Sequence, residues 1–375
     1  MKSLLLSFFC LFASLPSCET DTLQLQCLHS AYNLSQSMIW LNEDELLIGR
    51  WDGTIAIFDT KEGLLIQHAL IPNEKHGITM LTRLDDETFV SSNGPSSIAL
   101  WTKHLGNFSL KNTYDHDFGK ATSGCLVQIE HRQILVTGHE KGAILLWEAF
   151  DQDLFFLSSL HMQTTHPMPN SLNLFHIRDI VPWEKNHIIT ASEDGDICLI
   201  DIASKKIIHR QRYDSNASRG INHLALHGNY LLLANCPSDF SEKNLWLYKI
   251  DDDRFIAIDS KNLILDKAVK RAYSFDVEFI QRQDALYFFC STEEGLLWLG
   301  RVQDDTLFLL NHTPINPKGG AVLAINPKKN LLATAGYHIH VFEMSAATNE
   351  NSIPIVFQKR RSKITPKSFC ILQEN

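Results

Sequence analysis

Two histidines, His338 and His340, have the spacing that would allow metal chemistry. Side chains alternate along a β-strand with a period of two, so both rings would project from the same face and could reach one ion. No Asp, Glu or Cys in the neighbouring sequence completes a ligand set. We therefore expect a pair of ordinary strand histidines, with no metal and no cofactor.

Paired carboxylates are the other residues that could do chemistry, as at Glu293-Glu294 and Asp251-Asp252-Asp253. An acid/base pair must be held at a defined separation, whereas these residues fall in predicted turns, where carboxylates are solvated. The chain has no G-x-S-x-G elbow, no phosphate-binding Gly-rich loop and no H-E-x-x-H helix. The sequence therefore favours a protein that is not an enzyme.

The elements that position these residues are short strands joined by tight turns. Ile188 to Asp201 reads IITASEDGDICLID, in which Asp194-Gly195 separates two β-type runs. Gly readily takes the positive φ that a tight reversal needs, so this stretch predicts a β-hairpin.

The hairpin pattern recurs along the chain every 42 to 53 residues. Its third strand ends near an aromatic or apolar residue in most units, and the seven markers are Phe58, Trp101, Trp147, Ile200, Tyr248, Gly300 and Phe342. An inner strand precedes each hairpin, as at Gly77 to Leu81 and Ala321 to Ile325. A more polar outer strand follows it, as at Leu64 to Leu70 and Lys206 to Arg212. A period in the forties with four strands per unit is typical of propeller blades. We predict an all-β, seven-bladed β-propeller over residues 22–343.

These units resemble the WD-repeat family over most of the chain. Only Trp101 and Trp147 match the family's terminal tryptophan, and the Gly-His pair that precedes the inner strand is absent. The resemblance implies a propeller and a scaffold role, while the family's His-Ser-Asp-Trp hydrogen-bond set is not implied here.

A ring of blades must be closed, because the faces of each sheet are apolar and need neighbours. Thr22 to His29, TLQLQCLH, has the pattern of an outer strand whose blade is otherwise missing. We predict that it completes the seventh blade beside the strand ending at Phe342. Ile353 to Gln358, IPIVFQ, competes for the same position.

The first residues form a separate unit. Lys2 is followed by an apolar run from Leu4 to Leu15 and by small residues up to Cys18, which is the layout of a secretory signal peptide over residues 1–17. The alternative is a first β-strand. Leu15-Pro16-Ser17-Cys18 also resembles the lipobox of bacterial lipoproteins, which would place a lipid on Cys18 and anchor the protein to a membrane. Plain secretion competes with lipidation, so the expected location is exported, either periplasmic or membrane-anchored.

The composition is that of an ordinary globular protein, with 44% hydrophobic and 21% charged residues. The formal net charge of −9 offers no overall footprint for nucleic acid, so nucleic acid is not an expected partner. The eight cysteines show no CxxC spacing. We interpret those of the propeller as buried free thiols, with a disulfide framework or a zinc site as the alternative.

The C-terminal extension, residues 344–375, holds the second strand candidate and a basic cluster between Lys359 and Lys367. Such a cluster is either a solvated tail or a site for anionic lipid or nucleic acid. A nuclear signal is a further reading, which a signal peptide would exclude.

Loops that connect second to third strands, and loops that lead into first strands, gather on one face of such a propeller. The first set of loops is mostly acidic and the second mostly basic. A surface of mixed charge that also carries a few aromatic side chains is suited to protein recognition. The predicted partner-binding face comprises Arg50, Trp51, Asp52, His76, Glu140, Arg178, Glu193, Arg219, Arg271, Tyr273 and Glu293. A plain solvated surface is the alternative.

Two classes of function follow. The favoured one is a non-catalytic scaffold for protein partners that is exported, with or without a membrane anchor at Cys18. Its variant is an intracellular adaptor that keeps its first residues and is cytoplasmic. The other class is an enzyme or ligand binder that uses the central channel, for which Asn222 and Arg178 are candidate residues at the mouth.

Overall fold

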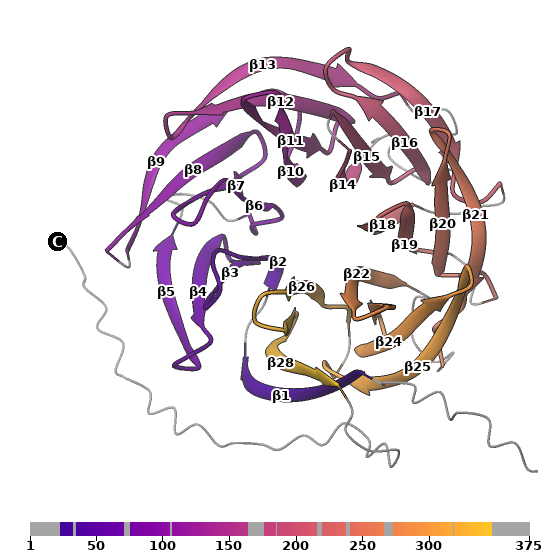
Figure 1. Ribbon diagram of the computed structural model, residues 1–375. Helices are drawn as coiled ribbons and strands as arrows, with labels where there is room; N and C mark the ends of the chain where they lie inside the picture. The colour runs from indigo at the N-terminus through magenta and orange to yellow at the C-terminus, as the bar shows by residue number, and fades with distance from the viewer. Residues whose placement is uncertain are drawn as a thin grey trace, which may run out of the picture.

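The computed structural model describes residues 23–32, 35–70, 76–105, 107–163, 176–184, 186–215, 220–237, 241–265, 273–317 and 319–346. Within these ranges the chain is all-β and forms a ring of seven four-stranded sheets around a central opening (Figure 1). The predicted seven-bladed β-propeller is confirmed. No helix in the described ranges is long and apolar enough to cross a membrane.

Six blades are continuous in sequence, and their strands run in order from the centre of the ring to its rim. Blades 1 to 3 consist of β2 (Ser35–Trp40), β3 (Glu45–Arg50), β4 (Thr54–Asp59) and β5 (Leu64–Leu70); β6 (Leu81–Arg83), β7 (Thr88–Asn93), β8 (Ser97–His104) and β9 (Asn107–Asp115); and β10 (Ala121–Ile129), β11 (Arg132–His139), β12 (Ala143–Phe150) and β13 (Asp153–His161). Blades 4 to 6 consist of β14 (Ile177–Trp183), β15 (His187–Ser192), β16 (Asp196–Asp201) and β17 (Lys206–Arg212); β18 (Ile221–His227), β19 (Tyr230–Asn235), β20 (Leu245–Asp251) and β21 (Arg254–Lys261); and β22 (Ser274–Arg282), β23 (Ala285–Thr292), β24 (Leu296–Gln303) and β25 (Thr306–Pro314).

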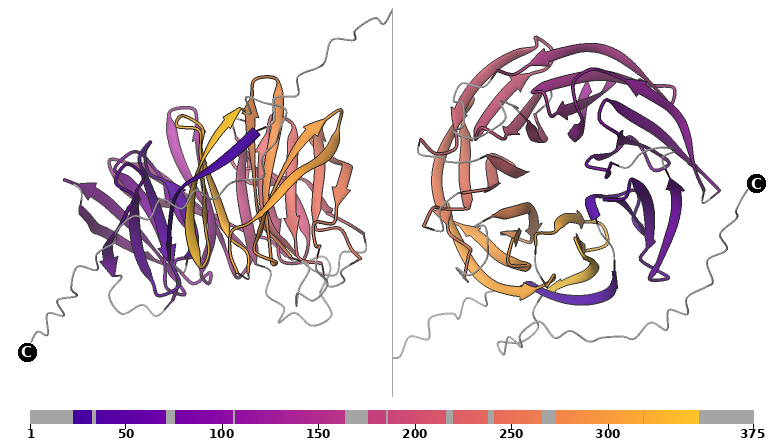
Figure 2. Two further views of the ribbon diagram at one scale, coloured as in Figure 1. Left: turned by 90° about the horizontal axis from the view of Figure 1, so that it is seen from below. Right: turned by 180° about the vertical axis from the view of Figure 1, so that it is seen from behind.

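Blade 7 combines the two ends of the described chain. It contains β26 (Val322–Asn326), β27 (Leu331–Ala335) and β28 (His338–Ala346), with β1 (Leu23–Tyr32) as its outer strand. β1 pairs antiparallel with β28, from Leu23 opposite Ala346 to Tyr32 opposite His338. Both views of Figure 2 place β1, in indigo, along the yellow β28. The competing segment, Ile353 to Gln358, lies outside the described residues.

The turns and outer strands follow the sequence closely. Gly195 has φ 87°, and its N–H donates to the Ser192 carbonyl at 3.1 Å, which closes the turn between β15 and β16. β17 has the predicted bounds. The inner strand predicted at Gly77 to Leu81 is displaced, because pairing with β7 extends from Leu81 to Arg83.

An apolar cluster lies at each of the seven interfaces between blades. At the closing interface Met38 and Phe58 of blade 1 share a cluster with Ala333 and Val341 of blade 7. Burying apolar surface is worth about 25 cal/mol per Å², and most of these faces would be exposed in a single blade. The ring is therefore the smallest unit that buries its own core.

Hydrogen bonds from the two strand tryptophans reinforce blades 2 and 3. Trp101 donates to the Ser91 hydroxyl at 2.9 Å, and Trp147 donates to the Thr137 hydroxyl at 3.1 Å. His139 Nδ1 lies 3.1 Å from the Gly119 carbonyl and Nε2 lies 2.8 Å from Thr137 Oγ1. Burial lowers the pKa of His139 to about 3, so the ring is neutral. Part of a tryptophan and hydroxyl pairing is thus present without the family's full four-residue set.

We expect Thr137→Val to lower the free energy of unfolding by about 1–3 kcal/mol, because the Trp147 indole N–H and the His139 ring would lose a buried partner. Urea unfolding followed by tryptophan fluorescence measures the effect. Thr113→Val, at an exposed position on β9, is the matched control and should change stability by less than about 0.5 kcal/mol. Equal stability of the two variants would contradict a structural role for this hydrogen bond.

The cysteines of the described residues are free thiols, as predicted: Cys27, Cys125, Cys198, Cys236 and Cys290. Cys198 and Cys290 are buried within the sheets, and burial raises the pKa of each to about 12. These two thiols therefore remain protonated at neutral pH and pack as small apolar side chains.

Several predictions concern residues outside the described ranges. These are the signal peptide over residues 1–17, Cys18 and its lipid, and the basic cluster from Lys359 to Lys367.

Candidate functional site

The two sets of loops that the sequence assigned to one face lie at the same end of the blades. Loops that follow second strands are hydrogen-bonded to segments that lead into first strands. Ile78 donates its N–H to the Arg50 carbonyl, Glu193 to His176 and Glu293 to Tyr273, all at 2.9 Å. We call this end of the propeller the loop face.

Arg50, Trp51, Asp52 and His76 lie together on the loop face, at the junction of blades 1 and 2. The Trp51 side chain is 59% exposed, and its indole N–H donates to the Ser35 carbonyl at 3.1 Å. Arg50 and Asp52 form an ion pair at 4.0 Å, and His76 is exposed. The indole is therefore held in position while most of its surface faces solvent.

A second group lies at the junction of blades 3 and 4. Arg178 forms an ion pair with Glu193, and Glu140 accepts the backbone N–H of Lys120 at 3.2 Å. Burial, together with the positive charge of Arg178, lowers the pKa of His176 beside them. This group is a mixed-charge surface whose charges are largely paired within the chain.

Tyr273 corrects one expectation. Its side chain is only 7% exposed and packs edge-on against Phe275, with ring centroids 6.2 Å apart, so it adds no aromatic surface to the loop face. A tyrosine just before an inner strand is covered because the strand enters the core at once. Glu293 lies beside it on the loop face, while Arg219 and Arg271 lie outside the described residues.

Tyr337 supplies the exposed aromatic surface that Tyr273 does not. It lies in the turn between β27 and β28 and is 47% exposed. Ser35 links this turn to Trp51, because its N–H donates to the Gly336 carbonyl at 3.0 Å while its own carbonyl accepts the indole N–H. The sequence signal was an aromatic residue in one of the two blade turns that lack the usual Gly pattern.

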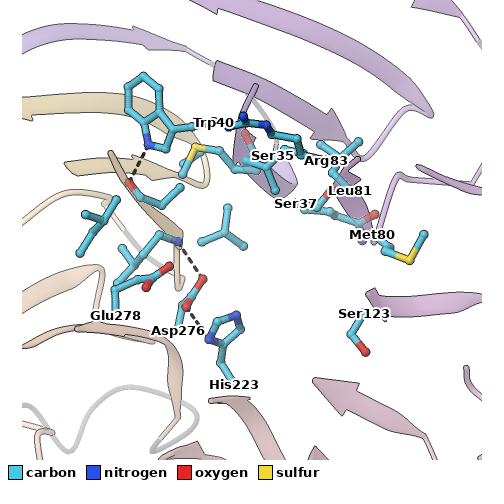
Figure 3. A pocket seen from close by; sticks show the side chains of 18 of the residues that line it. Ser35, Ser37, Trp40, Met80, Leu81, Arg83, Ser123, His223, Asp276 and Glu278 are labelled. Carbon is cyan, nitrogen blue, oxygen red and sulfur yellow. Dashed lines mark hydrogen bonds and ion pairs between the residues drawn. The ribbon is translucent and has the colours of Figure 1, made fainter. Parts of the chain in front are cut away.

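A central channel with a volume of about 1980 Å³ is lined by the first strands of all seven blades and, on the loop face, by Trp51 and Tyr337. Figure 3 shows part of its wall. The two channel candidates, Arg178 and Asn222, both line it. The Asn222 amide donates to the Ser274 carbonyl of the next blade at 2.6 Å, and Arg178 is paired with Glu193. Both are thus engaged in contacts within the protein.

One residue further along these strands lies an ionisable cluster that was not predicted from the sequence. His223 of β18 lies between two carboxylates, with Nδ1 2.9 Å from Asp276 Oδ1 and Nε2 3.5 Å from Asp179 Oδ2. Asp179 also accepts the Leu224 N–H at 2.7 Å, and Asp276 accepts the Leu323 N–H at 2.8 Å. The cluster therefore joins the inner strands of blades 4 to 7.

The charges of the cluster depend on one another. Burial by itself would lower the pKa of His223, but the carboxylates of Asp179 and Asp276 outweigh it and raise the pKa to about 10. Burial raises the pKa of Asp179, and the positive charge of His223 opposes that rise. His223 is therefore an imidazolium at neutral pH, which places a positive charge between the two carboxyl groups.

Glu278 is the third carboxyl group at this level of the channel, two residues after Asp276 on the same face of β22 (Figure 3). Burial and the Asp276 carboxylate raise the pKa of Glu278 to about 8. The side chain thus keeps its proton at neutral pH unless another positive charge approaches.

His338 and His340 project from the same face of β28, with ring centroids 6.0 Å apart. His340 is buried, and its Nε2 lies 2.7 Å from the Ile315 carbonyl. Across the described ranges, no group of three or more His, Cys, Asp or Glu side chains is arranged to hold a metal ion.

The seven blades and their closed ring define a WD-repeat-like β-propeller. Solved structures with this fold include the β-propeller domain of Cps50 (Swd1) from Myceliophteria thermophila, with a TM-score of 0.63, 17% identity, and coverage of 86% of this chain and 100% of that chain. A chain of the Mitotic Checkpoint Complex has a TM-score of 0.66, 10% identity, and coverage of 92% of this chain and 98% of that one. No protein-family model and no curated protein sequence matches this chain. The likeness at these identities concerns the fold.

Proposed function

We propose that this protein is a non-catalytic interaction platform that binds a partner protein through its loop face. The observation that supports the proposal is Trp51, a large aromatic side chain that is 59% exposed and oriented by its hydrogen bond to Ser35. Exposed, rigidly held aromatic residues among paired charges are typical of binding hot spots. One structurally similar chain belongs to a complex, which is consistent with a scaffold role.

A catalytic role is the less favoured alternative. Asp179 and Asp276 are engaged with His223, and each accepts a backbone N–H from a neighbouring blade.

The loop face is tested by Trp51→Ala combined with Tyr337→Ala. We expect the double variant to bind its partner at least tenfold more weakly, since truncating a single hot-spot aromatic residue costs about 2 kcal/mol or more. Quantitative affinity purification from the native source, with the wild-type protein as reference, measures this. Phe150→Ala, which removes a 67% exposed ring at the end of β12, is the control and should leave the captured proteins unchanged. If the double variant captured the same partners in the same amounts, the proposal would be wrong.

We further propose that the protein is exported and that Cys18 carries a lipid. The support is the basic residue, apolar run and small residues before Cys18 in the sequence. N-terminal sequencing of the mature protein should find a chain that begins at or near Cys18, and Cys18→Ser should release the protein from the membrane fraction. An intact Met1 in the cytosol would overturn export, and unchanged membrane association of Cys18→Ser would overturn the anchor.

A further inference from the structure

The central channel contains a carboxyl group, Glu278, that is not directly paired with a cation in the described part of the protein. Four basic side chains that line the channel already have acidic partners. The pairs are Arg83 with Asp86, Arg178 with Glu193, Lys61 with Asp44, and Lys328 with Glu43. His223 is shared between Asp179 and Asp276. Within the described ranges, Glu278 makes neither a hydrogen bond nor an ion pair.

Glu278 lies beside a second carboxyl group on the wall of the channel. It projects from the same face of β22 as Asp276, so the two carboxyl groups are neighbours along one wall (Figure 3). Three carboxyl groups and one imidazolium therefore share this level of the channel. One positive charge would complete the set.

The mouth above this level is aromatic. Phe275 lines the channel on β22, and the exposed rings of Trp51 and Tyr337 line it from blades 1 and 7. Aromatic faces attract Lys and Arg side chains and pack against their alkyl stems. A basic group that enters from the loop face therefore passes aromatic rings before it reaches the carboxyl groups.

We propose that the partner protein inserts a loop or chain end carrying a lysine or arginine into the channel, where the basic group pairs with Glu278. The proposal rests on the proposed function, because it assumes that the loop face binds a protein. Charge complementarity supports the proposal, because the Glu278 carboxyl group has no paired cation and lies where burial strengthens ion pairing. The volume of about 1980 Å³ is large enough for a short peptide segment.

The depth of Glu278 restricts the form of the partner. Glu278 follows Phe275 by three residues, which is about 10 Å along a strand. A basic residue on a flat surface would stop at the aromatic mouth. The partner must therefore present a protruding segment.

Proton release distinguishes this pairing from binding at the mouth alone. Because the pKa of Glu278 is about 8, a cation that pairs with it drives off its proton at neutral pH. Binding should thus release a proton below pH 8, and affinity should rise as the pH increases from 6 to 8.

The experiment titrates the full chain with capped pentapeptides Gly-Gly-Xaa-Gly-Gly in which the central residue is arginine, lysine or neutral citrulline. Isothermal titration in two buffers of different ionisation enthalpy gives affinity and proton release. We expect the arginine or lysine peptide to bind at least fivefold more tightly than the citrulline peptide and to release a proton. Glu278→Gln should abolish both differences, whereas Glu62→Gln, at an exposed turn, should preserve them.

Equal binding of the arginine, lysine and citrulline peptides, or preference for a basic peptide without proton release, would overturn the proposal using the wild-type protein alone. The partner itself gives a separate result. Suppose that Glu278→Gln captured as much partner as the wild type does, while Trp51→Ala combined with Tyr337→Ala captured none. This result would support partner binding by the loop face and contradict the pairing with Glu278 in the channel.

Discussion

His223→Leu is expected to lower the free energy of unfolding by about 3–5 kcal/mol at pH 7, because removing one partner of a buried ion pair leaves uncompensated charges. Asp179 and Asp276 would both lose the imidazolium that lies 3.5 and 2.9 Å from their oxygens. Because these two carboxyl groups accept hydrogen bonds from the inner strands of blades 5 and 7, the loss would destabilise the contacts between blades and not one blade alone. Urea unfolding at pH 7 measures the effect.

The same cluster predicts the pH dependence of the wild type. The pKa of His223 rises from about 6.5 in the unfolded chain to about 10 in the folded protein, so its stabilising contribution is complete below pH 6.5 and is lost as the pH rises through 10. Glu278 acts in the same direction, because its raised pKa of about 8 favours the folded state at lower pH. We therefore expect the melting temperature to fall between pH 6 and pH 10.

His223→Leu should flatten this fall above pH 8, where Glu278 has already lost its proton. His104→Leu replaces an exposed histidine on β8 and should keep both the stability and the pH profile of the wild type. A His223→Leu profile that matched the wild type between pH 8 and 10 would show that the imidazolium does not support the cluster.

Removing residues 1–32 is expected to abolish cooperative folding, since β1 is the outer strand of blade 7. The deletion exposes the edge of β28 and uncovers the cluster in which Leu23 and Leu25 contact the core of blades 6 and 7. Each of these leucines contributes about 1.5–3 kcal/mol by burial, and an unpaired strand edge invites aggregation. Circular dichroism and gel filtration should show an aggregated or partly folded product.

A transposed chain separates closure from chain length. When residues 23–32 follow Ala346 through a two-residue hairpin turn, the strand can pair with β28 in the same antiparallel register. We expect this chain to fold and melt cooperatively, while a version with Leu25→Asp in the transposed strand should not. If the deletion melted like the full-length protein, closure by β1 would be unnecessary.

The fold was accessible from sequence because each blade repeats the same local signals. β5 and β17 have the predicted bounds, and the Asp194-Gly195 turn forms where the alternation of apolar residues reverses. β6 is the exception. Its predicted pairing begins too early because Gly77 and the residues after it run beside the sheet before pairing starts at Leu81.

The channel cluster was not predicted because its members are far apart in sequence and unremarkable one at a time. Asp179, His223 and Asp276 are each the third residue of an inner strand, in three successive blades. Aligning the repeats by strand position would have placed them side by side. Burial could not be predicted from the sequence. It raises the pKa of Glu278 to about 8 and removes Tyr273 from the surface.

The direction of β1 sets how the molecule would stand on a support. Tyr32 lies opposite His338, next to the turn that holds Tyr337, while Leu23 lies opposite Ala346 at the far end of β28. The first residue of β1 therefore lies at the end of the propeller opposite the loop face. If the proposed lipid on Cys18 holds the protein to a membrane, the loop face would be turned away from that membrane and toward arriving molecules.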